Sequence, residues 1–229
     1  MFRRRIVIRS RTGTSQHVTR AALEDDFHHF RVEVASTLGQ VISVEAAAPR
    51  RPYTLCAQAA GQLQALVGMA LTPTAHEVTR VTDASEQCTH LFELSGLAIA
   101  AAARGTLRRQ YDIEVPMRVN DRTHSTLARD GVPLLEWHVL GTVIQGPPPY
   151  AGIDLYHGMA LVLRRATGIA KGRGMNLDAQ VHARPNGNCF AQQPVRAEQA
   201  IRIVGSTLDF ATRLDDLCAD DEAWLAFDE

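Results

Sequence analysis

Lysine is almost absent from this sequence, and cysteine is scarce. Lys171 is the only lysine among 24 basic residues, and 25 acidic residues bring the formal net charge to −1. The chain therefore lacks the basic excess that is typical of nucleic-acid-binding proteins. Four cysteines in 229 residues are too few for a disulfide framework at this size, so we expect reduced thiols.

Long hydrophobic runs are also missing. The longest apolar stretch, residues 94–103, falls far short of the roughly 20 residues that a membrane-spanning helix needs. Residues 2–6 have the charged start of a signal peptide, but charge returns at Arg9 before a hydrophobic region develops. We therefore expect a cytoplasmic protein with no nucleic-acid or membrane partner, and we leave open whether it forms a homo-oligomer.

Three motifs that identify common enzyme classes are absent. The sequence contains neither a P-loop nor the G-x-G-x-x-G pattern of dinucleotide-binding domains. It also lacks the G-x-S-x-G turn of acyl hydrolases. Residues 172–174 share only their glycines with a phosphate-binding loop. Any chemistry must therefore depend on other residues.

Hydrophobic periodicity predicts a β-hairpin followed by two helices in the first half of the chain. Residues 27–34 alternate like a half-buried strand, and residues 41–44 complete a hairpin with them. Helical spacing follows over residues 55–67 and again over residues 88–104, and each helix ends at a glycine.

The second half begins with more strands. Alternation predicts strands over residues 111–115 and 132–144, and a proline-rich break follows at residues 146–150. A further helix is predicted over residues 158–170. The pattern as a whole predicts an α+β fold.

This order of elements suggests three segments. We expect residues 1–21 to form an extended N-terminal arm, residues 22–108 to form the α+β unit, and residues 109–229 to form a second, β-rich half. No flexible linker separates the last two segments, so we expect them to share one core.

Two cysteines and two histidines are the candidates for chemistry. Cys56 and Cys88 lie at the starts of the two predicted helices, and His90 follows two residues later. Helix N-termini lower a thiol's pKa and so favour the thiolate that binds metal. His28, at the start of the first predicted strand, is the third candidate metal ligand. The alternative is that both cysteines are small buried hydrophobic residues.

Two segments resemble a known family. Residues 51–56 (Arg-Pro-Tyr-Thr-Leu-Cys) and residues 88–91 (Cys-Thr-His-Leu) are similar to an uncharacterised bacterial family, domain of unknown function 2889. A weaker similarity extends through the turn at residues 148–152. The sequence departs from the family at His29, where members tend to have an aspartate. The family has no established function, so the resemblance implies none.

A more distant likeness concerns the order of the elements. A hairpin, a cysteine at a helix start and a second cysteine opening an alanine-rich helix resemble the NifU-like domain of iron–sulfur cluster scaffold proteins. The resemblance implies a NifU-like fold for residues 22–108, with Cys56 and Cys88 as metal ligands. The first cysteine of that family is missing here, and His28 and Asp26 are the nearest replacements. An iron–sulfur cluster needs several thiolates, so the missing cysteine favours a single metal ion over a cluster.

The leading hypothesis is therefore a metal-binding enzyme. Cys56, Cys88 and His28 would hold one divalent ion, Zn or Fe, and His90 would be either the fourth ligand or a base beside an open position. The alternatives are a non-catalytic iron–sulfur or metal carrier, a structural metal-site protein, and a ligand-binding protein with buried thiols. Whether the chain is an enzyme stays open.

The expected partner is a small-molecule substrate. A guanidinium pairs with a carboxylate through two hydrogen bonds, so Arg51 suits a small organic or aromatic acid, and Tyr53 is the second expected substrate-binding residue. The expected reaction combines Lewis-acid catalysis with proton transfer by His90. The alternative is an arginine that only covers the end of a strand.

Overall fold

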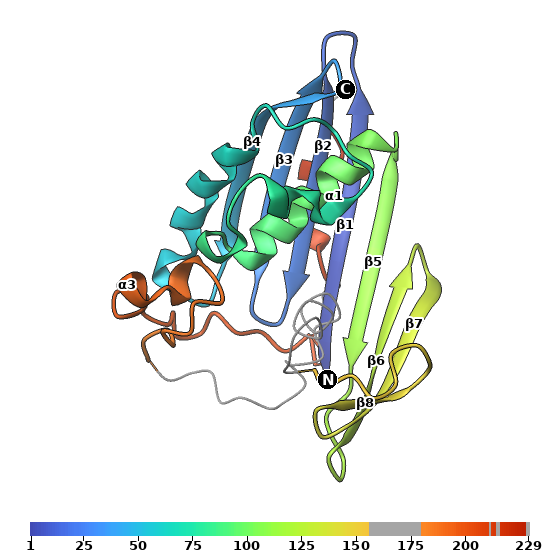
Figure 1. Ribbon diagram of the computed structural model, residues 1–229, viewed down its shortest axis with the longest axis vertical. Helices are drawn as coiled ribbons and strands as arrows, with labels where there is room; N and C mark the ends of the chain where they lie inside the picture. Colours follow the sequence, from blue (N-terminus) through green and yellow to red (C-terminus); the bar gives the residue numbers. More distant parts are fainter. Residues whose placement is uncertain (156–179, 211, 214–215, 228–229) are drawn as a thin grey trace.

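The computed structural model describes residues 1–155, 180–210, 212–213 and 216–227. Within these residues the main element is one antiparallel sheet of eight strands in the order β4-β3-β2-β1-β5-β6-β7-β8 (Figure 1). The strands are β1 (Phe2–Thr12), β2 (His17–Asp25), β3 (His29–Thr37), β4 (Gln40–Arg50), β5 (Arg108–Val115), β6 (Arg122–Arg129), β7 (Val132–Leu140) and β8 (Val143–Gly146).

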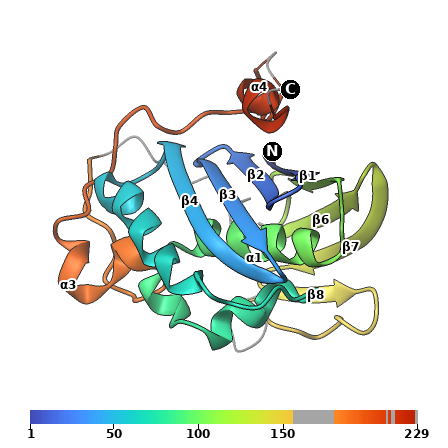
Figure 2. The same ribbon diagram turned by 90° about the horizontal axis from the view of Figure 1, so that it is seen from above.

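Helical segments cover both faces of this sheet. Figure 2 shows α1 on one face of β2 and β3 and α4 on the opposite face. No helix of the described residues is both long enough and apolar enough to cross a membrane. The helical segments are η1 (Thr54–Leu66), η2 (Ala75–Arg80), η3 (Ala84–Glu86), α1 (Thr89–Ala103), η5 (Phe190–Gln192), α3 (Pro194–Ala197), η6 (Ala219–Asp221) and α4 (Glu222–Leu225).

The predicted α+β fold with a NifU-like unit is wrong. The predicted hairpin exists as β3 and β4, and the predicted helix over residues 88–104 exists as α1. The hairpin is nevertheless not part of a separate unit, because β3 also pairs with β2 and the sheet continues through β1 into β5. The protein is instead mainly β. The prediction failed because alternation in the sequence predicts a strand but does not specify its neighbours in the sheet.

Residues 1–21, expected to form an arm, instead supply β1 and the first half of β2 in the middle of the sheet. The consecutive arginines Arg3, Arg4 and Arg5 of β1 hide the hydrophobic alternation, although Arg4 is buried. Residues 55–67 are helical as predicted, but as the 3-10 helix η1. Strand β6 had no predicted counterpart, and the helix predicted over residues 158–170 lies outside the described residues.

The two largest hydrophobic clusters of the described residues lie along the sheet. The main core packs β1 to β4 against α1 and η1, and the second core involves β5, β7 and β8. Phe2 of β1 belongs to the second core, whereas Ile6 of the same strand belongs to the main core. Arg4 lies between them in sequence, so the polar group around it marks the junction of the two cores.

One glycine fixes how closely α1 approaches its neighbour. A Cβ at Gly96 would meet the backbone oxygen of Ala75 at the start of η2. We expect Gly96→Ala to destabilise the protein by about 1–3 kcal/mol through overpacking, although alanine is the better helix former by about 1 kcal/mol. Thermal unfolding beside Gly61→Ala, where a Cβ meets open space, tests this. Equal melting temperatures for both variants would contradict it.

Candidate functional site

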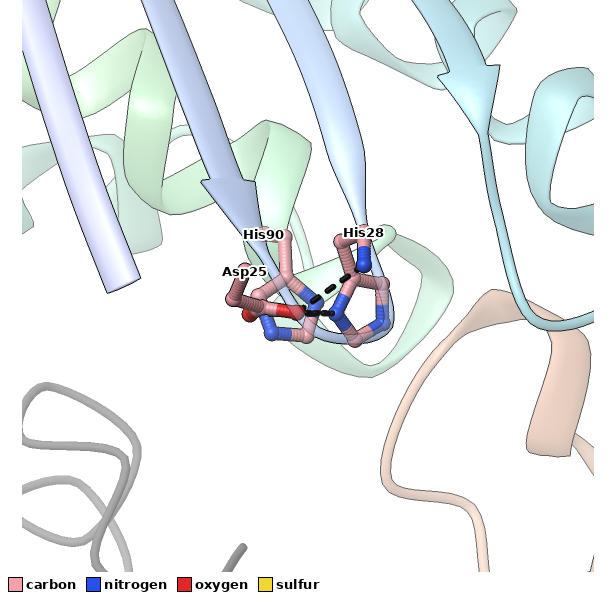
Figure 3. Close-up of side chains that lie close together, drawn as sticks. All are labelled: Asp25, His28 and His90. Carbon is pink, nitrogen blue, oxygen red and sulfur yellow. Dashed lines mark hydrogen bonds and ion pairs between the residues drawn. The ribbon is translucent and has the colours of Figure 1, made fainter. Parts of the chain in front are cut away.

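Four polar side chains meet where β2 ends beneath the first turn of α1. Arg4 comes from β1, Asp25 from the end of β2, His28 from the turn into β3, and His90 from α1. Figure 3 shows Asp25, His28 and His90 side by side at this point. The strand register places Arg4 directly opposite Asp25, so the sheet itself brings these two residues together.

The carboxylate of Asp25 is fully buried and accepts hydrogen bonds at both of its oxygens. Arg4 donates from Nε at 2.9 Å and from Nη2 at 2.7 Å to Oδ2. The backbone N–H groups of Phe27 and His28 donate to Oδ1 at 2.7 and 2.9 Å. These four donors favour the ionised carboxylate, and the buried guanidinium of Arg4, 1% exposed, balances its charge.

The same carboxylate fixes the proton on His28. Nδ1 of His28 lies 2.9 Å from Oδ1 of Asp25. An ionised carboxylate can only accept, so Nδ1 carries the hydrogen and Nε2 of a neutral ring keeps its lone pair. The ring is 6% exposed and lies near Phe30, with 5.3 Å between ring centroids.

His90 is held as a neutral imidazole. Nη2 of Arg4 lies 2.9 Å from Nε2 of His90. A guanidinium has no acceptor, so Nε2 of His90 accepts and the ring hydrogen resides on Nδ1. The positive end of α1 also disfavours an imidazolium here. The rings of His28 and His90 lie 4.0 Å apart at their centroids, so the imidazole whose base atom is Nε2 adjoins one that carries its hydrogen on Nδ1.

These groups could also hold a metal ion. Asp25, His28 and His90 each offer one ligand atom, and these three atoms lie within 4.8 Å of one another. A carboxylate with two imidazoles is a known ligand set for zinc and iron. However, Arg4 already donates to both Asp25 and His90. A cation would have to displace this guanidinium.

The predicted cysteine ligands lie elsewhere. Cys56 is buried in η1 within a small cluster of alanines, and Cys88 is buried in the main core at the N-cap of α1. Neither belongs to the group formed by Asp25, His28 and His90. Burial raises the pKa of the Cys56 thiol above its usual range, and the nearby thiols of Cys88 and Cys189 raise it further. Loss of water contact outweighs the expected effect of a helix start.

The predicted substrate residues, Arg51 and Tyr53, both precede Cys56 in the chain. Nη1 of Arg51 donates to the backbone oxygen of Ala48 at 2.9 Å. Tyr53 precedes η1 and packs against the cluster around Cys56, and the Arg202 guanidinium lies 5.9 Å from its ring centroid. Both residues therefore belong to the segment that leads into η1. Their role in substrate binding stays a prediction.

Asp26, considered as a replacement for the missing cysteine, has another environment. Its Oδ1 accepts a hydrogen bond from the backbone N–H of Phe210 at 3.3 Å. Burial raises the pKa of Asp26 to about 6. Asp26 thus connects the turn to residues 208–210, whereas Asp25 binds Arg4 and His28.

Arg4 is the site residue that the sequence reasoning missed, and Asp25 was not selected either. A signal existed at Arg4, because Phe2, Arg4 and Ile6 occupy alternate positions of one strand. An arginine between two such hydrophobic residues shares their buried face. A buried arginine needs an acid partner, but the alternation does not specify which acidic residue that is.

Comparisons with known proteins identify only part of the chain. Neither a curated protein nor a solved structure matches it, and the likeness to the NifU-like domain receives no support. Residues 9–104 include Asp25, His28 and His90, while Arg4 precedes them. This segment, residues 9–104, matches the family model described as "Protein of unknown function (DUF2889)".

Proposed function

We propose that the chain is an enzyme that moves a proton on a small organic acid-type substrate, with His28 as the general base. The observation that carries this proposal is the 2.9 Å contact between Nδ1 of His28 and the buried carboxylate of Asp25. This pairing directs the lone pair of Nε2 away from Asp25. A carboxylate that orients a histidine in this way also stabilises the imidazolium formed when the ring takes up a proton.

The other two residues support that chemistry. Arg4 keeps Asp25 ionised and sets the hydrogen of His90 on Nδ1. A donor next to the base, at the positive end of α1, would stabilise an oxygen that gains negative charge as a proton leaves a neighbouring carbon. The substrate class that suits this pair is a small carbonyl compound or carboxylic acid with an acidic C–H bond. The low exposure of His28 argues for a small molecule.

Hydrogen–deuterium exchange tests the proposal. Aliphatic and aromatic acids are incubated with the protein in D2O, and deuterium at the acidic carbon is measured by NMR. We expect His28→Asn to slow the exchange by about 10²–10⁴-fold, the usual contribution of a general base. His138→Asn is the matched control, because His138 is an exposed residue of β7. Equal exchange by wild type and His28→Asn would contradict the proposal.

The ring hydrogens can be checked without a substrate. Long-range ¹H–¹⁵N NMR spectra distinguish the two neutral tautomers of histidine. We expect both His28 and His90 to carry the hydrogen on Nδ1, because Asp25 accepts from one ring and Arg4 donates to the other. A spectrum with the hydrogen on Nε2 of His28 would overturn the assigned base.

A metal-dependent enzyme is the second candidate, favoured by the 4.8 Å grouping of Asp25, His28 and His90. When bound there, a zinc or iron ion would supply Lewis-acid polarisation of a substrate oxygen. Metal analysis of wild type, His28→Asn and Cys56→Ala separates the ligand sets. Metal lost only in His28→Asn favours this group, whereas metal lost in Cys56→Ala as well favours the set with both cysteines. Wild-type protein without stoichiometric metal contradicts both.

A further inference from the structure

Three arginines lie in a row across the face of the sheet opposite α1. On β1, Ile6 and Ile8 belong to the main core, whereas Arg9 is exposed and faces away from it. The register places Arg9 directly opposite Arg20 of β2 and Arg108 of β5. Residues opposite each other in antiparallel strands have Cβ atoms about 4.5–5.5 Å apart, and like charges at such positions repel.

Only one of the three has its charge balanced within the described chain. Nε of Arg20 donates to Glu33 at 2.6 Å, and Nη1 donates to the backbone oxygen of Trp224 at 2.6 Å. Among the residues that the structure describes, neither Arg9 nor Arg108 forms an ion pair or a side-chain hydrogen bond, and both are exposed. Two adjacent guanidinium charges therefore remain uncompensated by the part of the chain that the structure describes.

Two other arginines of the same strand share one carboxylate, and each also pairs with the acid opposite it on β5, Arg3 with Glu114 and Arg5 with Asp112. Arg3 and Arg5 lie on the same face of β1 as Arg9, at alternate positions. Both reach the carboxylate of Asp216, with Nη1 of Arg5 at 2.5 Å from Oδ2 and Nη2 of Arg3 at 3.7 Å from Oδ1. Neighbouring arginines on this face thus hold one oxyanion between them. Further along β1, at Arg9, no described residue supplies that oxyanion.

We propose that Arg9 and Arg108 form a binding site for the phosphate group of a small phosphorylated molecule. Guanidinium groups match phosphate oxygens in a bidentate fashion. A phosphate dianion balances both uncompensated charges, whereas a single carboxylate balances one. The site lies on the sheet face opposite Arg4, which pairs with Asp25 on the α1 side, so it does not depend on the proposed proton transfer.

Inorganic pyrophosphate is the probe for this site. Isothermal titration at low ionic strength, with sodium chloride as the comparison, measures binding to the full chain. We expect Arg9→Gln and Arg108→Gln each to weaken binding by about tenfold, which is about 1.4 kcal/mol. Arg104→Gln is the control, because Arg104 is an exposed arginine at the C-terminal end of α1 and its loss should leave binding unchanged.

Neither substitution should disturb the fold, because the replaced side chains are exposed. Removing one of two repelling charges should leave the melting temperature unchanged or slightly higher. The proposal is overturned if wild type does not bind pyrophosphate, or if Arg104→Gln weakens binding as much as Arg9→Gln does. Tighter binding of a single-stranded oligonucleotide through the same two arginines would replace the small molecule with a polynucleotide as the occupant.

Discussion

Arg4→Met is expected to lower the free energy of unfolding by about 3–5 kcal/mol, the usual cost of removing one partner from a buried ion pair. The carboxylate of Asp25 would lose two charge-assisted hydrogen bonds while it stays fully buried. His90 would lose the donor to its Nε2 in the same substitution. Urea denaturation of wild type and variant measures the difference.

Two further variants identify the cause. Arg9→Met removes an exposed arginine from the same strand, and we expect a change within about 0.5 kcal/mol. The double variant Arg4→Met with Asp25→Asn should recover part of the loss, because it no longer buries an unpaired charge. If Arg4→Met were as stable as Arg9→Met, the ion pair with Asp25 would not hold this part of the sheet together.

The second large effect is expected at Arg50, the last residue of β4. Its guanidinium donates to four backbone oxygens and to Oε1 of Glu24 at 3.1 Å. Three of the four oxygens belong to the turn that carries Asp25 and His28, and they are those of residues 25, 26 and 28. Arg50 therefore holds the backbone on which the proposed base depends.

We expect Arg50→Met to destabilise the protein by about 2–5 kcal/mol, because these acceptors and the buried Glu24 lose their donor. Arg51→Met is the matched control, since the neighbouring guanidinium donates to the single backbone oxygen of Ala48. The NMR signals of the His28 ring should shift in Arg50→Met and stay in place in Arg51→Met. Equal stability of the two variants would show that the turn holds its shape without Arg50.

Regular hydrophobic patterns made part of this fold predictable. Val32 and Val34 recur at the spacing of a strand in β3, and Leu91 and Leu94 recur at the spacing of a helix in α1, and all four are buried. In β1 the same alternation is interrupted by buried Arg4. The central strand was therefore expected to be an arm, since a run of arginines usually indicates solvent exposure.

The candidate site was predictable only in part. His28 and His90 were selected because they lie at the starts of a strand and a helix, and the structure brings their rings within 4.0 Å. The expected grouping with Cys56 and Cys88 depended on a likeness of element order that the eight-stranded sheet overturns. Asp25 and Arg4 meet through strand register, which local sequence does not specify.

The amino-acid sequence alone determined which faces of the strands and of α1 are apolar, the near-neutral charge, and the two histidines worth testing. Tertiary structure alone decided that β1 lies between β2 and β5. That placement sets Arg4 against Asp25 and sets Arg9 between Arg20 and Arg108. The reason is physical: side-chain alternation is a local property of each strand, whereas the choice of neighbours depends on burying the surfaces of segments far apart in the chain.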